Sequence, residues 1–252
     1  MRYRFGGAFV FLLLCSVAVA FAGMPARYHD FAHIGDGGGL RTTFLVLNQS
    51  QRDTANITLE FYDDDGEPWS LAVNGRTGPV YSAAIPPGGS LKLTTAGEAA
   101  EAHGGWARLT ATGEVGAQVL FEIRSGGQLV TQAAVQSSGP LHSADLFVER
   151  AAGTNTGVAL ASLSRSGQIR VSMSLFDGTG TQLGTEAVSL GPLMHKAKFL
   201  TELFPEVTAV RGTLKLSASG PIAVTTLQQT GLVLGTLSPV RRVFSKDTGG
   251  GQ

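Results

Sequence analysis

The sequence is poor in groups that cross-link a chain, with a single cysteine, Cys15, among 252 residues. Cys15 lies in an uncharged apolar run, residues 9–20, that follows a short cationic start and precedes the small-x-small pattern Ala20-Phe21-Ala22. This arrangement is typical of a signal peptide with its cleavage site. We therefore expect residues 1–22 to be removed on export to the periplasm, the cell surface or the medium. The mature chain would have no disulfide, so its fold would depend on buried apolar area.

Charge is also scarce, because only 15% of the residues are charged and the 19 basic residues balance the 19 acidic ones. A nucleic-acid surface needs clustered Lys and Arg, so we expect no nucleic-acid partner. After residue 22 no apolar segment approaches the roughly 18 residues that a membrane-spanning helix requires. We therefore expect no membrane span in the mature chain.

Recognisable catalytic motifs are missing. The chain has no Gly-x-Ser-x-Gly elbow, no His-Glu-x-x-His and no phosphate-binding loop, which are the short signatures of common hydrolases, metalloproteases and nucleotide-binding enzymes. We predict a protein that is not an enzyme and has no cofactor. An enzyme of unknown type stays open as an alternative, because a pair of carboxylates for glycoside hydrolysis is defined by its separation in space and not by its spacing in sequence.

Glycine and alternating apolar residues are abundant. The chain has 34 glycines, and Ile57, Leu59 and Phe61 alternate with polar residues in the period-2 pattern of a half-buried strand. We expect residues 41–48 and 55–63 to be strands that pair with each other. Gly113-Glu114 and Gly126-Gly127 suggest tight hairpins. About seven such strands before residue 137, with turn residues every 8 to 12 positions, predict an antiparallel β-sandwich.

A repeat organises the chain. The stretch Thr42–Gly66 returns 114 positions later, without a gap, as Thr156–Gly180. The fold class we predict is all-β, with two tandem antiparallel β-sandwich units related by an internal repeat. Residues 23–139 would form the first unit and residues 140–243 the second, followed by a disordered tail at 244–252. In the second unit, Phe199–Pro205 has the spacing of one short helical turn that plugs an open end of the sandwich.

An acidic turn follows the second predicted strand, and its carboxylates are Asp63, Asp64, Asp65 and Glu67. Calcium prefers several such oxygens on a flexible loop. The spacing is not that of the alternating Asp-x-Asp-x-Asp-Gly loop, however, and the second copy of the repeat keeps only Asp177 of the three aspartates. A solvated hairpin turn is the competing interpretation.

Two histidines, His29 and His33, lie near Asp30 and Asp36 and raise the question of a metal site. In an extended segment the two histidines would be about 13 Å apart, at ~3.3 Å per residue. That distance is too long for one ion, so we assign these side chains to the surface or to packing.

Two aromatic residues, Trp69 and Tyr81, are candidates for stacking on sugar rings. They support a carbohydrate-binding or adhesive module as the main alternative function. An exposed aromatic face near these residues would favour it.

Several turns and strand starts resemble a tandem module of exported bacterial proteins, immunoglobulin- or fibronectin-like in architecture. The similar segments are Phe31–Thr43, Leu45–Asn48, Phe61–Gly66, Pro86–Gly89 and Gly105–Ala107, with Phe199–Pro205, Arg211-Gly212 and Gly220–Ile222 in the second copy. The resemblance implies a fold and a compartment, and it brings no catalytic residues. We therefore predict a non-catalytic structural or interaction module outside the cytoplasm, whose partner is a protein or glycan at the cell surface.

Overall fold

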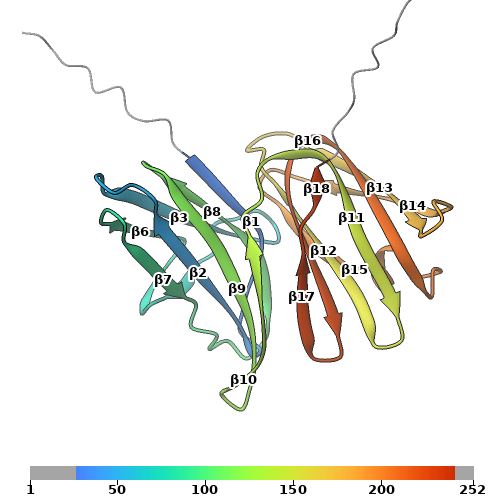
Figure 1. The fold of residues 1–252 in the computed structure, drawn as a ribbon, viewed down its shortest axis with the longest axis horizontal. Helices are drawn as coiled ribbons and strands as arrows, with labels where there is room; N and C mark the ends of the chain where they lie inside the picture. Colours follow the sequence, from blue (N-terminus) through green and yellow to red (C-terminus); the bar gives the residue numbers. More distant parts are fainter. Residues whose placement is uncertain (1–26, 242–252) are drawn as a thin grey trace, which may run out of the picture.

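A computed structural model describes residues 27–241. The predicted signal peptide, residues 1–22, and the predicted tail, residues 244–252, lie outside the described residues. The described chain is all-β, with antiparallel sheets and one short helix (Figure 1). We call residues 27–136 the first half and residues 141–241 the second half. No helix among residues 27–241 is long and apolar enough to cross a membrane.

The first half consists of two four-stranded antiparallel sheets that enclose a common core. One sheet has the order β1 (Arg27–Asp36), β8 (His103–Ala111), β3 (Ala55–Asp63), β6 (Val80–Ile85). The other has the order β10 (Gln128–Gln136), β9 (Val115–Ser125), β2 (Leu40–Asn48), β7 (Ser90–Thr94). A small ribbon joins β4 (Leu71–Val73) to β5 (Arg76–Gly78).

The alternation predicted for β3 is confirmed, because Ile57, Leu59 and Phe61 are buried in the core of the first half. Phe44 from the opposite sheet packs between the two layers, with its ring centroid 5.9 Å from that of Phe61 and 5.5 Å from that of Phe31. Edge-to-face and tilted aromatic pairs at these distances are favourable. The two apolar faces therefore meet in one sandwich core.

Two expected strand pairings are wrong. β2 and β3 do not pair but lie in facing sheets, and Gly113-Glu114 is a corner between sheets, because β8 and β9 belong to different sheets. The alternation of apolar residues identifies the buried face of a strand but not its neighbour. At the β2–β3 corner the amide of Asn48 donates to the carbonyls of Asp53, Ile85 and Pro86 at 2.8–3.0 Å. The Gly126-Gly127 hairpin is confirmed, since β9 and β10 pair around it.

The second half is one curled antiparallel sheet instead of two separate sheets. Its order is β14 (Gln182–Leu190), β13 (Ile169–Asp177), β16 (Val210–Thr230), β11 (Leu141–Ala151), β12 (Thr154–Ser162), β15 (His195–Phe199). Two further strands are β17 (Val233–Leu237), which pairs with β16, and β18 (Val240–Arg241), which pairs with β11. The 21-residue strand β16 makes this continuity possible, because its beginning pairs with β11 and β13 and its end with β12 and β17.

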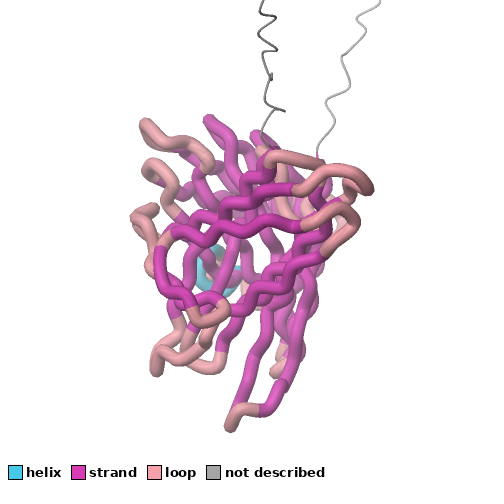
Figure 2. The backbone as a smooth tube through the Cα atoms, turned by 90° about the vertical axis from the view of Figure 1, so that its left-hand side faces the viewer, coloured by secondary structure: helices cyan, strands magenta, loops and turns pink. Residues whose placement is uncertain are grey.

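The predicted helical turn is present as α1 (Leu200–Leu203), seen as the cyan segment among the strands in Figure 2. Its residues Leu200 and Leu203, with the following Phe204, are buried in the core of the second half. The carboxylate of Glu202 accepts a hydrogen bond from the backbone N–H of Phe199 at 2.8 Å, which satisfies a free donor at the start of the helix. The turn is therefore confirmed and packs into the second core; its role as a plug over an open end stays a prediction.

The two halves lie side by side. β1 contacts β12, β15 and β16, while β8 contacts β15 and β10 contacts β17. The hairpins β9–β10 and β16–β17 extend toward the same end of the molecule (Figure 1). The space between the halves contains both the contacts that join them and the candidate site.

Candidate functional site

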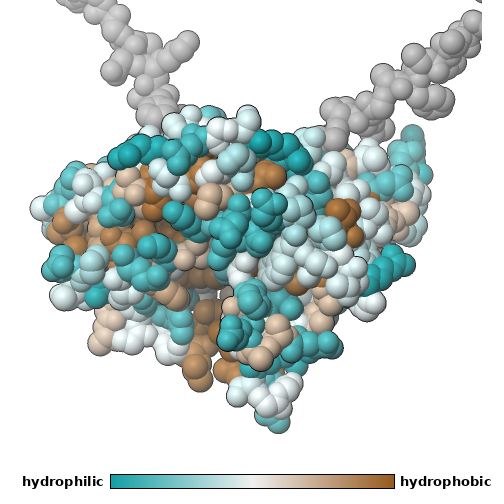
Figure 3. All heavy atoms as spheres, turned by 180° about the vertical axis from the view of Figure 1, so that it is seen from behind, coloured by the Kyte–Doolittle hydropathy of each residue, from teal (hydrophilic) through white to brown (hydrophobic). Residues whose placement is uncertain are grey.

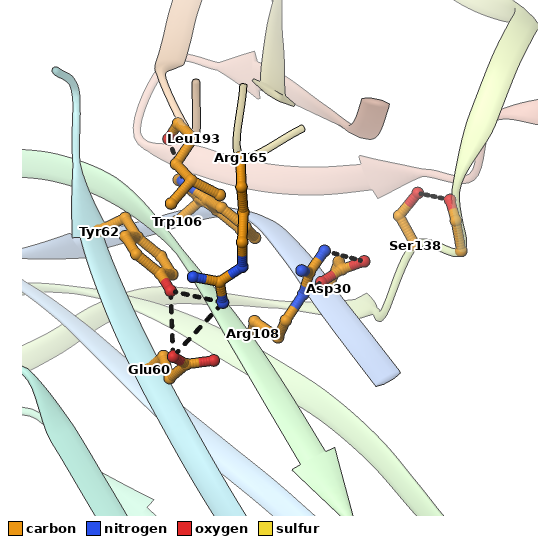
Figure 4. A network of polar contacts seen from close by, with 9 residues as sticks. Asp30, Glu60, Tyr62, Trp106, Arg108, Ser138, Arg165 and Leu193 are labelled. Carbon is orange, nitrogen blue, oxygen red and sulfur yellow. Dashed lines mark hydrogen bonds and ion pairs between the residues drawn. The ribbon is translucent and has the colours of Figure 1, made fainter. Parts of the chain in front are cut away.

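A small third cluster of buried residues, which we call the joint, connects the halves. It contains Ala32, Tyr62 and Trp106 from the first half and Ala161 and Ala223 from the second. Trp106 is fully buried. Its ring stacks on Tyr62 with centroids 4.8 Å apart. Its indole N–H donates to the carbonyl of Leu193 in the other half at 2.6 Å (Figure 4).

Polar contacts surround the joint. Arg165 of the second half reaches the Tyr62 hydroxyl at 3.5 Å and the Glu60 carboxylate at 3.7 Å (Figure 4). Nearby, Arg108 holds the buried carboxylate of Asp30 with two hydrogen bonds, of 2.6 and 3.2 Å. Bidentate pairing of this kind is needed when a carboxylate leaves water. Arg108 and Asp30 both belong to the first half, so the charged contact across the joint is the one that Arg165 makes with Glu60.

The acidic turn after β3 packs directly against the second half. Gly66 in this turn has φ of +83°, and an added Cβ would overlap the carbonyl oxygen of Pro192 and lie 2.8 Å from the carbonyl carbon of Leu193. Only glycine combines this backbone conformation with so close an approach. The turn is therefore a contact between the halves.

Next to this contact lies a chain of three ionisable side chains from both halves. The Asp64 carboxylate is 2.6 Å from Nδ1 of His195, and Nε2 of His195 is 3.2 Å from Nδ1 of His33. The two imidazole rings are stacked, with centroids 5.2 Å apart. His195 is 1% exposed, whereas the Asp64 side chain is 69% exposed. Solvent therefore reaches the carboxylate end of the chain more readily than its centre.

The electrostatics of this chain follow from hydrogen bonding and burial. The hydrogen bond from His195 lowers the pKa of Asp64, which keeps that carboxylate ionised. Burial, together with the neighbouring His195, lowers the pKa of His33 to about 3. His33 is therefore neutral at neutral pH.

A cleft between the halves lies beside His33. Its volume is about 340 Å³, and most of its lining is apolar, including Leu40 and Phe121 of the first half and Val158, Leu227 and Leu234 of the second. Figure 3 shows hydrophobic surface reaching into the gap between the two lobes. A concave, mostly apolar cleft with a few polar groups, at the small end of the range of about 300–1,000 Å³, is typical of a small-molecule site.

The structure places the residues of the acidic turn in different roles. Asp63 accepts hydrogen bonds from the backbone N–H groups of Asp65 and Glu67 at 3.0 and 2.9 Å, so its carboxylate shapes the turn. Asp64 contacts His195, while Asp65 and Glu67 are exposed. Among residues 27–241 no group of three or more His, Cys, Asp or Glu side chains could hold a metal ion. Calcium binding at the turn stays a prediction.

The two sugar-stacking candidates, Trp69 and Tyr81, are half-buried and pack against the core of the first half. Arg76 lies over the ring of Tyr81 at 5.4 Å. Neither residue lines the cleft between the halves. Their role as glycan contacts stays a prediction.

The sequence patterns missed most of this site. In the sequence His33 lies near His29, which instead contacts Ser137, and no motif marks His195. His195 is 131 positions from Asp64 and 162 positions from His33, so no short motif contains the three residues. The one available signal is that Thr42–Gly66 has more aspartates than the similar stretch Thr156–Gly180, and Asp64 is one of them.

Comparisons with family models, with curated proteins and with solved structures each find no match. The class that the structure supports is an all-β protein with several antiparallel sheets.

Proposed function

We propose that the protein is an exported, non-catalytic interaction module of two tandem β-sandwich units, which binds its ligand in the cleft between them. The apolar cleft of about 340 Å³ is the observation that carries this proposal. Export is proposed from the signal-like sequence of residues 1–22.

We further infer that the two units are copies of one ancestral unit. The strand order β1-β8-β3-β6 in the first half corresponds to β14-β13-β16-β11 read in the opposite direction. β2 and β3 span Leu40–Asn48 and Ala55–Asp63, and β12 and β13 span Thr154–Ser162 and Ile169–Asp177, each 114 positions later. The same offset relates the repeated stretches of sequence, which supports the tandem arrangement. The two facing antiparallel sheets of the first half support the immunoglobulin- or fibronectin-like class.

The firm contacts between the halves favour binding over a purely structural role. Trp106, Gly66 and Asp64 of the first half each meet backbone or a side chain of the second half. Such contacts hold the cleft walls in place, and a preformed site loses less conformational entropy when a ligand binds.

The histidine chain next to the cleft is the feature that most resembles a catalytic group. A general base works best when the pKa of its conjugate acid is close to the working pH. The pKa of His33 is lowered to about 3, so this imidazole is a weak base at neutral pH. This favours a binding role over the enzyme alternative.

A fluorescent apolar probe tests the proposal. We expect 8-anilinonaphthalene-1-sulfonate to bind the protein and to become fluorescent. An Ala197→Trp variant should lose this signal, because Ala197 is an exposed residue in the cleft lining and indole would fill the space. Ala84→Trp is the matched control, since Ala84 is exposed on the edge strand β6, away from the cleft.

Equal probe binding by the wild type and both variants would contradict binding in the cleft. A polysaccharide pull-down tests the carbohydrate-binding alternative in parallel. Retention on a glycan that is lost in Trp69→Ala would replace the cleft proposal with the adhesive one.

A further inference from the structure

One hydrogen-bonding atom in the cleft region has no partner within the described part of the chain. His33 lines the cleft, and its Nδ1 is engaged with His195 at 3.2 Å. Among residues 27–241 no hydrogen bond involves its other ring nitrogen, Nε2. A ligand group that donates a hydrogen to this nitrogen would therefore gain a hydrogen bond beside the apolar lining of the cleft.

The chain of three side chains determines what that nitrogen can do. The ionised carboxylate of Asp64 accepts a hydrogen bond, so the proton of a neutral His195 lies on Nδ1. Nε2 of His195 is then an acceptor, and Nδ1 of His33 must be the donor in the contact between the two rings. A neutral imidazole carries only one N–H, which leaves Nε2 of His33 with a free lone pair. Asp64 thus fixes His33 as a hydrogen-bond acceptor through His195.

The charged groups around the cleft do not change the role of His33 Nε2 as a hydrogen-bond acceptor. The carboxylate of Glu122 is held by Arg124 at 3.1 Å, and that of Glu202 by the N–H of Phe199 at 2.8 Å. Arg41 and Lys198 take part in none of the ion pairs found among residues 27–241. Lys198 is exposed to solvent, however, whereas His33 is partly buried. Thr225 and Glu122 of the cleft lining are more deeply buried than His33. What distinguishes His33 is a partly buried, uncharged ring nitrogen that is set as an acceptor by the contacts with His195 and Asp64.

We infer that the cleft binds small amphipathic alcohols, whose apolar body packs between the two halves and whose hydroxyl group donates a hydrogen bond to Nε2 of His33. The inference rests on the proposed binding function and names the class of ligand. The cleft volume of about 340 Å³ accommodates roughly ten heavy atoms, at the ~30 Å³ that one water molecule occupies in the liquid. A site that uses a fixed acceptor discriminates against analogues without a matching donor.

Isothermal titration calorimetry with three related probes tests the inference. The probes are 1-octanol, its methyl ether and octanoate, which share one apolar chain and differ in the head group. At pH 8 imidazole groups in water are neutral. We expect 1-octanol to bind about tenfold more tightly than the methyl ether, which has no hydroxyl proton, and more tightly than octanoate.

Two variants and one measurement on the unaltered protein locate the effect. His33→Phe keeps an aromatic ring but removes the acceptor, so it should weaken 1-octanol binding about tenfold and leave binding of the ether unchanged. Ala197→Trp should abolish binding of both probes, and Ala84→Trp should abolish neither. In the wild type, adding 1-octanol should change the ¹⁵N chemical shift of His33 Nε2, and adding the ether should not. This measurement does not depend on the folding of any variant.

Each contrary result is informative. Equal affinity for the alcohol and the ether, or tighter binding of octanoate, would overturn the inference. If Ala197→Trp still blocked binding of these probes, the cleft would remain the proposed binding site, and only the preference for alcohols would be lost. If 1-octanol did not bind at all, the inference would fall, and the fluorescent-probe result would decide separately whether the cleft is a binding site.

Discussion

Two turns of the molecule have the same backbone chemistry and different surroundings. In the first, Asp63 Oδ1 accepts hydrogen bonds from the backbone N–H groups two and four residues later, at 3.0 and 2.9 Å. In the second, Asp177 Oδ1 accepts the equivalent bonds, both at 2.9 Å. Gly66 and Gly180 follow at the same place, with φ of +83° and +88°. An aspartate at the start and a glycine three residues later therefore suffice to form the turn.

The two turns differ in what they touch. Gly66 packs against the backbone of the other half, whereas a Cβ on Gly180 would meet no atom within 4 Å. Asp64 binds His195, and the residue at the corresponding place in the second turn is Gly178. The comparison shows that turn shape and turn use are encoded by different residues. The additional carboxylate of the first turn makes a contact between the halves.

Acid should affect the surroundings of the first turn before it affects the second. The unfolded chain takes up a proton on His33 near pH 6.5, but the pKa in the folded protein is about 3. The unfolded state therefore binds more protons between these values, and stability falls as the pH falls from about 6.5 to 3. The contribution of one such group is at most about 1.4 kcal/mol per pH unit. Urea unfolding at a series of pH values measures this slope.

Comparing the wild type with His33→Phe shows how much of this dependence of stability on pH comes from His33. His29 also has its pKa lowered by burial, so it too lowers stability as the pH falls below about 6.5. His33→Phe should flatten the slope only in part. Asp64 and Asp177 both have lowered pKa values, so their stabilisation is lost at lower pH, as the carboxylates become protonated. An unchanged slope in His33→Phe would show that His33 is protonated equally in both states.

A matched pair of glycine substitutions should separate the shape of the turns from their contacts. Gly180→Ala places a Cβ in the left-handed region and should cost about 1–2 kcal/mol. Gly66→Ala adds to that cost an overlap with the backbone of Pro192 and Leu193, which should raise the loss by about a further 1–3 kcal/mol. Chemical denaturation of the two variants measures the difference. Equal losses would mean that the close approach of the halves contributes nothing.

Exchanging the distinctive residues of the two turns should give the smallest effect. Asp64→Asn weakens the hydrogen bond to His195 and should cost about 1 kcal/mol, because the carboxylate is largely exposed and screened by solvent. Gly178→Asp adds a carboxylate where no histidine lies opposite, and it should change stability by less than about 0.5 kcal/mol. Thermal unfolding at low ionic strength compares them. Similar shifts for both variants would contradict the specific role of Asp64.

The sequence predicted those parts of the fold that local chemistry determines. The alternation in β3, the Gly126-Gly127 hairpin and the helical turn near Leu200 depend on neighbouring residues, and all three are present. The partners of β2 and β3 were predicted wrongly, because a strand with one buried face can pair with its neighbour or pass to the opposite sheet. Residues distant in sequence decide that choice.

The candidate site was less predictable for the same reason. Its members Asp64, His33 and His195 come from three different elements, and each looks ordinary in its own segment. A lone histidine in a strand carries no short-range signal of its partners. The comparison of the similar stretches Thr42–Gly66 and Thr156–Gly180 points to the acidic turn, but it cannot indicate that Asp64 faces a histidine 131 positions away.

The separation of the two cores has a consequence for the order of folding. The buried residues of the first core all precede residue 136 and those of the second all follow residue 143, and from the second half only the partly buried Leu227 and Leu234 pack against the first core. Each half can therefore collapse on its own, with docking as a later, slower step. Trp106 belongs to the joint and to neither core. Its fluorescence should thus follow the docking of the halves, and a refolding experiment would record that step as a phase of its own.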